Sequence, residues 1–169
     1  VIHTLEDLME AYRWITTSPD ARRFETICLD SLSEIGEVVL AHLIKTKGQN
    51  DPRKAYGELL PQVTQMIRAF RDLPGKNVYM AAKMESMKDE MSGIVKYMPS
   101  MPGQKLGPQL PYFFDEVFRL AIGKDDKGQM FRYLQTQPDM QYEAKDRSGA
   151  LAAMEPPDLS HVFRKIKGV

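Results

Sequence analysis

An apolar segment that ends in an aspartate is the first place where this sequence could do chemistry. Residues 24–29 (FETICL) are followed by Asp30 and Ser31 and then by a segment with helical spacing. In open α/β sheets, ligands bind outside the carboxyl ends of the strands. A carboxylate at such an edge can hold Mg²⁺ through water molecules, because Mg²⁺ loses its hydration shell reluctantly. Asp30 and Ser31 are therefore candidates for binding a nucleotide, with Asp30 as the Mg²⁺ ligand.

The same junction also has a purely structural interpretation. Ser31-Leu32-Ser33-Glu34 has the form of a capping box, in which the serine and the glutamate satisfy backbone N–H groups at the start of a helix. The two interpretations are compatible, because Asp30 can serve a metal ion while Ser31 caps the helix.

Lys83 follows a second apolar segment, residues 78–82 (VYMAA). If that segment is a strand beside the first, Lys83 emerges at the same edge of the sheet as Asp30. An amine there could contact a γ-phosphate and pass its presence on to the residues that follow. The alternative is a solvated lysine in a turn rich in Lys and Glu.

The segment 84–111 is predicted to be a long irregular loop, since prolines, glycines and methionines are spread along it. Loops of this length inside a compact domain are usually functional or disordered. Lys88, Lys96 and Lys105 with Tyr97 between them are typical of a surface for single-stranded nucleic acid, which needs cations for phosphates and a ring for stacking. A cluster of acidic residues at one end weakens this interpretation, and the alternative is a flexible surface connector.

A second pair of cations, Lys145 and Arg147, lies on a turn that ends at Gly149. Two cations at this spacing could clamp a phosphate, including one bound by a neighbouring subunit, where positive charge stabilises a transition state. A polar turn without a ligand is the alternative.

Hydrophobic spacing and turn residues predict the elements that would position these side chains. Helices are expected at 5–15, 32–45, 53–72 and 158–167, with Pro61 kinking or splitting the third. Strands are expected at 25–29, 78–82, 112–122 and 129–135, the last two joined by a hairpin turn at 125–128. Alternating elements followed by a hairpin predict a mixed sheet covered by helices.

Composition narrows the class of protein. The chain of 169 residues has 43% apolar residues, and 23 basic residues balance 23 acidic ones, so bulk charge indicates neither nucleic acid nor membrane. The single cysteine, Cys28, rules out a disulfide framework and argues against a zinc site, which fits a reducing cytoplasm. No apolar run approaches the roughly 20 residues of a membrane span.

The order of these motifs resembles that of a known family. Residues 26–32 (TICLDSL) resemble a Walker B strand of the RecA type. Further resemblance is carried by YG at 56–57, FRDLPGKNV at 70–78, AKME at 82–85, PSMPG at 99–103, PYFFDEV at 111–117 and AKDRSG at 144–149. Together they resemble the phage-encoded AAA/RecA-like ATP-binding proteins of the Sak recombinase group. That group is associated with single-strand DNA binding, annealing and phage recombination.

The resemblance implies a fold and a set of roles. The expected fold is α/β, a single partial RecA-like P-loop NTPase domain over 1–169, with a mostly parallel mixed sheet flanked by helices and a C-terminal antiparallel hairpin. Asp30 would be the Walker B carboxylate, and Lys83 would lie near the γ-phosphate. The segment 84–111 would be the mobile DNA-binding loop. Lys145 and Arg147 would reach the nucleotide of a neighbouring subunit.

The same resemblance implies ATP and Mg²⁺ as cofactors, single-stranded DNA as a partner, a homo-oligomeric ring or filament, no membrane, and the host cytoplasm as location if the protein is phage-encoded. One departure is large. The Walker A loop, G-x-x-x-x-G-K-[ST], does not occur in the sequence. We therefore expect the first strand and the P-loop to lie upstream of Val1 or to have been lost, and this polypeptide alone to bind ATP weakly or not at all.

Two other functions remain open. The chain could be a non-enzymatic RecA-fold remnant that serves assembly or partner binding, or a helicase or helicase-loader ATPase. In RecA-like ATPases the glutamate that polarises water usually precedes Walker B, so the resemblance implies that this residue, too, is missing from the sequence. Glu34 is a poor substitute, because it is expected to belong to the helix cap.

Overall fold

The computed structural model describes residues 1–48 and 51–169. Within these residues the chain forms two compact units. The N-terminal unit comprises Val1–Met84 and Pro99–Gln109, and the C-terminal unit comprises Glu85–Met98 and Leu110–Val169. The division does not decide whether 1–169 is one domain, so that expectation stays a prediction.

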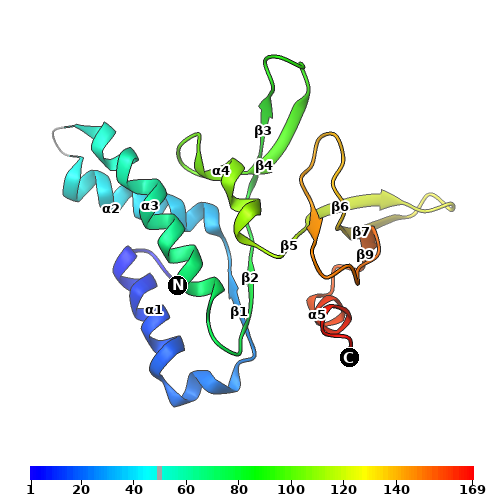
Figure 1. The fold of residues 1–169 in the computed structure, drawn as a ribbon, viewed down its shortest axis with the longest axis horizontal. Helices are drawn as coiled ribbons and strands as arrows, with labels where there is room; N and C mark the ends of the chain where they lie inside the picture. Colours follow the sequence, from blue (N-terminus) through cyan, green and yellow to red (C-terminus); the bar gives the residue numbers. More distant parts are fainter. Residues whose placement is uncertain (49–50) are drawn as a thin grey trace. The chain divides into compact units, whose positions relative to one another are not determined.

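Four helical segments of the N-terminal unit follow local sequence signals (Figure 1). They are α1 (Leu5–Thr17), the short 3₁₀ helix η1 (Pro19–Arg23), α2 (Leu32–Lys47) and α3 (Pro52–Arg71). Each α-helix begins at the side chain that caps it, which is Thr4, Ser31 or Asp51. Such caps satisfy N–H groups that have no partner within the helix. The three helices predicted for this region are confirmed.

Pro61 lies inside α3 without splitting it. A proline in a helix interior removes one hydrogen bond and costs about 3 kcal/mol. The helix is retained because it buries a continuous apolar face, formed by Leu59, Val63, Ile67 and Phe70. Full burial of one such side chain contributes roughly 1.5–3 kcal/mol. The face therefore outweighs the proline, and α3 packs alongside α2 (Figure 1).

Strands β1 (Thr26–Leu29) and β2 (Asn77–Met80) form a parallel pair in the register Thr26↔Asn77 to Leu29↔Met80. Among the described strand pairs whose register is known, the other pairs, β5–β8, β6–β7 and β7–β9, are antiparallel. The mixed α/β class is confirmed, whereas a larger parallel sheet and a RecA-like core stay predictions. The first strand is also less buried than its apolar sequence indicates, since Leu29 is buried but Cys28 is exposed.

The segment 84–111 is not the irregular loop that its composition predicts. It contains β3 (Met84–Lys88) and β4 (Val95–Pro99), which pair with each other, and the short helix α4 (Leu106–Gln109). The turn between the strands is formed by Asp89, whose Oδ1 accepts from Met91 N at 2.9 Å and Ser92 N at 2.8 Å. Gly93 then adopts φ 72°, a conformation that favours glycine.

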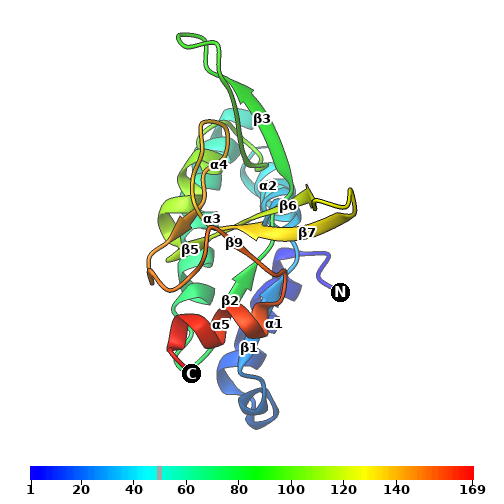
Figure 2. The same ribbon diagram turned by 90° about the vertical axis from the view of Figure 1, so that its right-hand side faces the viewer.

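The C-terminal unit is built from small antiparallel sheets (Figure 2). The predicted hairpin is confirmed as β6 (Arg119–Lys124) and β7 (Met130–Gln135), and β9 (Met154–Glu155) pairs with β7. A separate pair joins β5 (Glu116–Val117) to β8 (Lys145–Asp146). The strand expected at 112–122 is instead the end of a 3₁₀ helix, η2 (Leu110–Phe113), followed by β5 and the start of β6.

The last helix, α5 (Leu159–Lys167), confirms the prediction for 158–167 and begins at the cap Asp158. It covers the small core of this unit, in which Val162 packs with Leu134 and Leu151. Leu134, Leu151 and Val162 all belong to the C-terminal unit, so this unit has a core of its own that positions its candidate residues.

Candidate functional site

The ends of β1 and β2 meet at one edge of the N-terminal unit, as the sequence predicts. Ala81 N donates to Leu29 O at 2.9 Å, and Leu32 N donates to Ala81 O at 2.7 Å. These bonds continue the parallel pairing beyond the strands and hold the start of α2 against the residues before Lys83. The edge therefore brings Asp30, Ser31 and Lys83 into one region.

Asp30 is exposed at this edge. Its peptide bond to Ser31 is cis. Its carboxylate influences the neighbouring strand: burial raises the pKa of Tyr79, and the charges of Cys28 and Asp30 raise it further. Within the described residues, no group of three or more His, Cys, Asp or Glu side chains could hold a metal ion. A lone exposed carboxylate fits Mg²⁺ bound through one protein ligand, waters and phosphates, but not a cation held by the protein alone.

Ser31 confirms one half of the predicted capping box. Its Oγ accepts from Glu34 N at 3.3 Å. The carboxylate of Glu34 is instead paired with Lys83, with Glu34 Oε2 3.0 Å from Lys83 Nζ. Glu34 therefore links α2 to the end of β2, which differs from the cap role that the sequence indicates.

Lys83 is held from three sides. Its backbone N donates to Ser33 Oγ at 2.9 Å, and its carbonyl accepts from Ser100 N at 2.7 Å. Both Lys83 and Glu34 side chains are more than half exposed, so their ion pair contributes less than about 1 kcal/mol and is easily exchanged for another partner. The backbone of Lys83 thus connects the start of α2 to the residues after β4. Its amine can exchange Glu34 for another anion.

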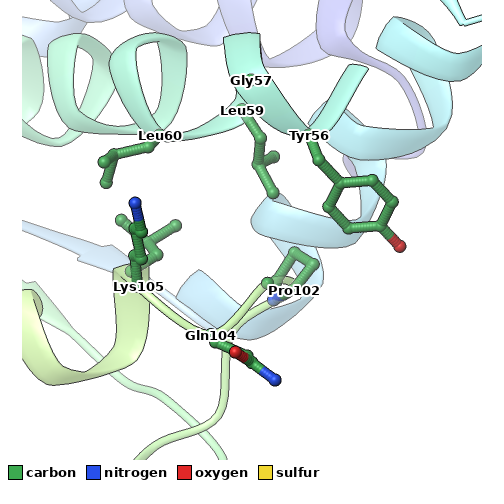
Figure 3. A pocket seen from close by; sticks show the side chains of 9 residues that line it. Tyr56, Gly57, Leu59, Leu60, Pro102, Gln104 and Lys105 are labelled. Carbon is green, nitrogen blue, oxygen red and sulfur yellow. The ribbon is translucent and has the colours of Figure 1, made fainter. Parts of the chain in front are cut away.

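The predicted DNA-binding residues are divided between the two units. Lys88, Lys96 and Tyr97 lie on the β3–β4 hairpin, which belongs to the C-terminal unit, whereas Lys105 belongs to the N-terminal unit. Lys105 lines a cavity of about 510 Å³ between α3 and the residues before α4. Figure 3 shows Tyr56 and Leu59 on the α3 side and Pro102 and Lys105 on the other.

Tyr97 belongs to a stack that the sequence does not reveal. Its ring lies parallel to that of Tyr142, with centroids 4.7 Å apart and planes 8° apart. The guanidinium of Arg119 lies over the Tyr142 ring, 3.4 Å from its centroid. No local motif reveals these contacts, because Tyr97 and Tyr142 are more than forty positions apart and Arg119 and Tyr142 more than twenty. Arg119 and Tyr142 are thus residues that sequence reasoning missed.

Lys145 and Arg147 each have a different partner within the C-terminal unit. Lys145 Nζ donates to Pro111 O at 2.9 Å, and Arg147 Nη1 lies 2.8 Å from Asp115 Oδ1. The Arg147 pair is highly exposed, with 71% of each side chain accessible. Arg147 is accordingly free to exchange partners, whereas Lys145 anchors its turn to the segment before β5.

The carboxyl groups of Glu116 and Asp146 form a further feature without a sequence motif. The two residues are directly opposite each other in the β5–β8 pair. Burial, followed by the hydrogen bond and charge of Asp146, raises the pKa of Glu116 to about 7. Burial acts in the same direction on Asp146, but hydrogen bonds from Ser148 and Leu151 leave its pKa below the usual value.

No helix in the described ranges is both long and apolar enough to cross a membrane. In comparisons with known proteins, the sequence profile of a family described as an AAA domain matches residues 1–148. No curated protein and no solved structure matches the chain.

Proposed function

The chain belongs to the AAA domain family, and from this membership we propose that it acts in an ATP-binding protein of the RecA-like type, which anneals or recombines single-stranded DNA. The family supports an ATPase-type function for the chain. The Mg²⁺–ATP site, the DNA substrate and the oligomer are the finer parts of the proposal.

The observation that carries the proposal is the meeting of Asp30 and Lys83 at one strand edge. Leu32 N–Ala81 O and Lys83 N–Ser33 Oγ hold the two strand ends together. In this arrangement Asp30 would hold Mg²⁺ through water, Ser31 would face the nucleotide, and the Lys83 amine would exchange Glu34 for a γ-phosphate. Mg²⁺ would supply charge neutralisation of the phosphates, and the residues of the chain would position them.

The link from nucleotide to DNA runs through the backbone of Lys83. Its carbonyl accepts from Ser100 N, which directly follows β4. A change in the position of Lys83 would therefore move Ser100, which directly follows the hairpin that carries Lys88, Lys96 and Tyr97. Cations next to an aromatic ring suit single-stranded DNA, because phosphates and bases are then bound by different groups.

Lys145 and Arg147 would complete the site of a neighbouring copy in a homo-oligomer. The exposed Arg147–Asp115 pair supports this role, since an exposed pair costs little to break. An arginine that moves onto a transferring phosphoryl group stabilises the charge that develops there.

The proposal is tested by Mg²⁺-dependent ATP hydrolysis and by the anisotropy of a labelled single-stranded oligonucleotide, with and without ATP. Residues 1–169 contain no G-x-x-x-x-G-K-[ST] motif, so both the chain and the whole product of its gene are assayed. Asp30→Asn should lower hydrolysis by about 100-fold or more, the size of effect that loss of one transition-state interaction produces. Asp126→Asn, an exposed hairpin carboxylate, is the matched control.

Several outcomes would contradict the proposal. If the Asp30→Asn variant hydrolyses ATP at the unsubstituted rate, Asp30 does not hold Mg²⁺. If the folded gene product neither binds nor hydrolyses ATP, the result favours a RecA-fold remnant that serves assembly. This remnant is the second candidate function, because residues 1–169 contain no G-x-x-x-x-G-K-[ST] motif. Strand unwinding in place of annealing would identify a helicase.

A further inference from the structure

The turn that carries Lys145 and Arg147 is organised by one carboxylate. Asp146 Oδ1 accepts from Ser148 Oγ at 2.5 Å and from Gly149 N at 3.1 Å, and Asp146 Oδ2 accepts from Leu151 N at 2.9 Å. Three donors around one carboxyl group favour its ionised form. Ionised Asp146 therefore fixes the path of the backbone from β8 to Leu151.

Glu116 faces this carboxylate and lacks a donor of its own on one oxygen. Its Oε1 accepts from Ser148 N at 3.2 Å, whereas its Oε2 is buried and has no hydrogen-bond partner among the described residues. A buried carboxylate oxygen without a donor is costly, and a second negative charge opposite Asp146 would add repulsion. A protonated Glu116 removes both problems, because its O–H can donate to Asp146.

The neighbouring charges do not neutralise the pair. On the β5 side, the Asp115 carboxylate is paired with Arg147, with Asp115 Oδ1 2.8 Å from Arg147 Nη1. On the β8 side, the Lys145 amine donates to Pro111 O at 2.9 Å. The two cations of this turn thus have partners elsewhere, and a proton on Glu116 would satisfy its second oxygen.

We propose that Glu116 and Asp146 share one proton, and that this proton positions the turn which presents Lys145 and Arg147. When Glu116 loses the proton to water, two carboxylates face each other across β5 and β8, the pair separates and the turn loosens. Glu116 and Asp146 are positioning residues, since they act through the turn. The role of the cations on that turn rests on the proposed function, but the proton-sharing geometry does not.

Hydrogen exchange of the turn amides tests the proposal on the chain itself, without ATP. The amides of Ser148, Gly149 and Leu151 are followed between pH 5.5 and 8.5, with intrinsic exchange rates divided out. Their protection should fall as the pH rises through neutrality, by up to about tenfold per pH unit for release of one proton. Glu116→Gln should abolish this dependence, because the glutamine amide donates to Asp146 at every pH.

Glu143→Gln is the matched control, since Glu143 is exposed in the same unit and its loss should leave the pH profile unchanged. A flat profile in the unsubstituted chain would overturn the proposal, as would a Glu116→Gln profile that still depends on pH. If Glu116→Gln does not fold, the carboxyl ¹³C shift of Glu116 in the unsubstituted chain decides instead. Titration near 7 supports the shared proton, and titration in the ordinary range of glutamate refutes it.

The result is distinguishable from a failure of the proposed function. If the pH profile behaves as expected while Arg147→Ala retains full ATP turnover, control of the turn by the proton is supported. The role of Arg147 toward a neighbouring nucleotide is then refuted. If turnover depends on Arg147 while the profile is flat, the reverse conclusion follows.

Discussion

Tyr97 and Tyr142 stack face to face, with ring centroids 4.7 Å apart, and this contact ties the β3–β4 hairpin to the loop before β8. A backbone hydrogen bond reinforces it, since Tyr97 N donates to Gln141 O at 2.7 Å. Arg119 covers the second face of Tyr142. Tyr97 would therefore have only its outer face left for a base.

Tyr142→Ala should loosen the hairpin while leaving the helical core of the N-terminal unit intact. The substitution removes one stacked pair and one cation–π contact, each worth on the order of 1 kcal/mol. We expect the Tyr97 amide to exchange about tenfold faster, as measured by hydrogen exchange. Tyr112→Ala is the control, because Tyr112 is 78% exposed. Equal exchange in both variants would show that the stack does not hold the hairpin.

Lys76→Met should destabilise the N-terminal unit. The Lys76 amine donates to Ala21 O at 3.0 Å and Arg22 O at 3.3 Å, and also to Phe24 O, so it satisfies three carbonyls at the end of η1. Methionine keeps the length of the chain but removes these three hydrogen bonds, so that Ala21 O keeps only its bond from Phe24 N at 3.2 Å, and the loss costs about 1–3 kcal/mol. Urea unfolding measures the loss. Lys45→Met, at an exposed helix position, should change the free energy of unfolding by less than about 0.5 kcal/mol.

The helices of this chain could be predicted because their signals are local. Thr4, Ser31 and Asp158 precede apolar residues at helical spacing, and each caps a helix in the structure. The β6–β7 turn was equally predictable, since Asp125 and Gly128 supply its side-chain acceptor and its positive φ.

The β3–β4 hairpin could not be predicted by the same means. All five residues of β3 are exposed, so they show no alternation of buried and exposed side chains. Asp89 and Gly93 resemble the turn residues of the other hairpin, but they lie among methionines and glycines that indicate a loop.

The candidate site was predictable only in part. Asp30 and Lys83 were found because each follows an apolar strand, and parallel strands end at the same edge. The Glu34–Lys83 ion pair and the Glu116–Asp146 pair join residues that are distant in sequence and have no motif. Contacts of this kind depend on tertiary packing, which a single sequence does not reveal.

Arg147→Ala and Lys145→Ala should separate function from stability in the assembled protein. Both are expected to reduce ATP turnover, measured by phosphate release. Arg147→Ala should cost less than about 1 kcal/mol of unfolding free energy, because its partner Asp115 is equally exposed. Lys145→Ala should cost somewhat more, since its hydrogen bond to Pro111 O is partly buried. If both variants keep full turnover and the chain still hydrolyses ATP, the two cations have no role in hydrolysis.

Glu155 should make the C-terminal unit sensitive to acid. Its side chain is only 3% exposed and contacts the Lys165 amine, His161 Nε2 at 3.2 Å and Ala152 N at 2.7 Å. Burial raises the pKa of this carboxyl, but the hydrogen bond and charge of Lys165, with those of Ala152 and His161, leave it below 4.5. Because the folded pKa lies below the unfolded one, the carboxylate stabilises the fold above the unfolded value, and this contribution is lost as the pH falls.

Glu155→Gln should therefore lower the free energy of unfolding at pH 7 by about 2–3 kcal/mol, because the lysine and histidine lose a charged partner in a buried position. The same variant should flatten the decline in stability as the pH falls below the ordinary pKa of a glutamate, because unsubstituted Glu155, whose pKa is lowered in the fold, takes up its proton there. Thermal unfolding followed at several pH values measures both effects. Glu90→Gln, at an exposed position on the hairpin turn, should keep the unsubstituted profile. A Glu155→Gln chain that loses stability in acid as steeply as the unsubstituted one would show that another carboxylate dominates the acid response.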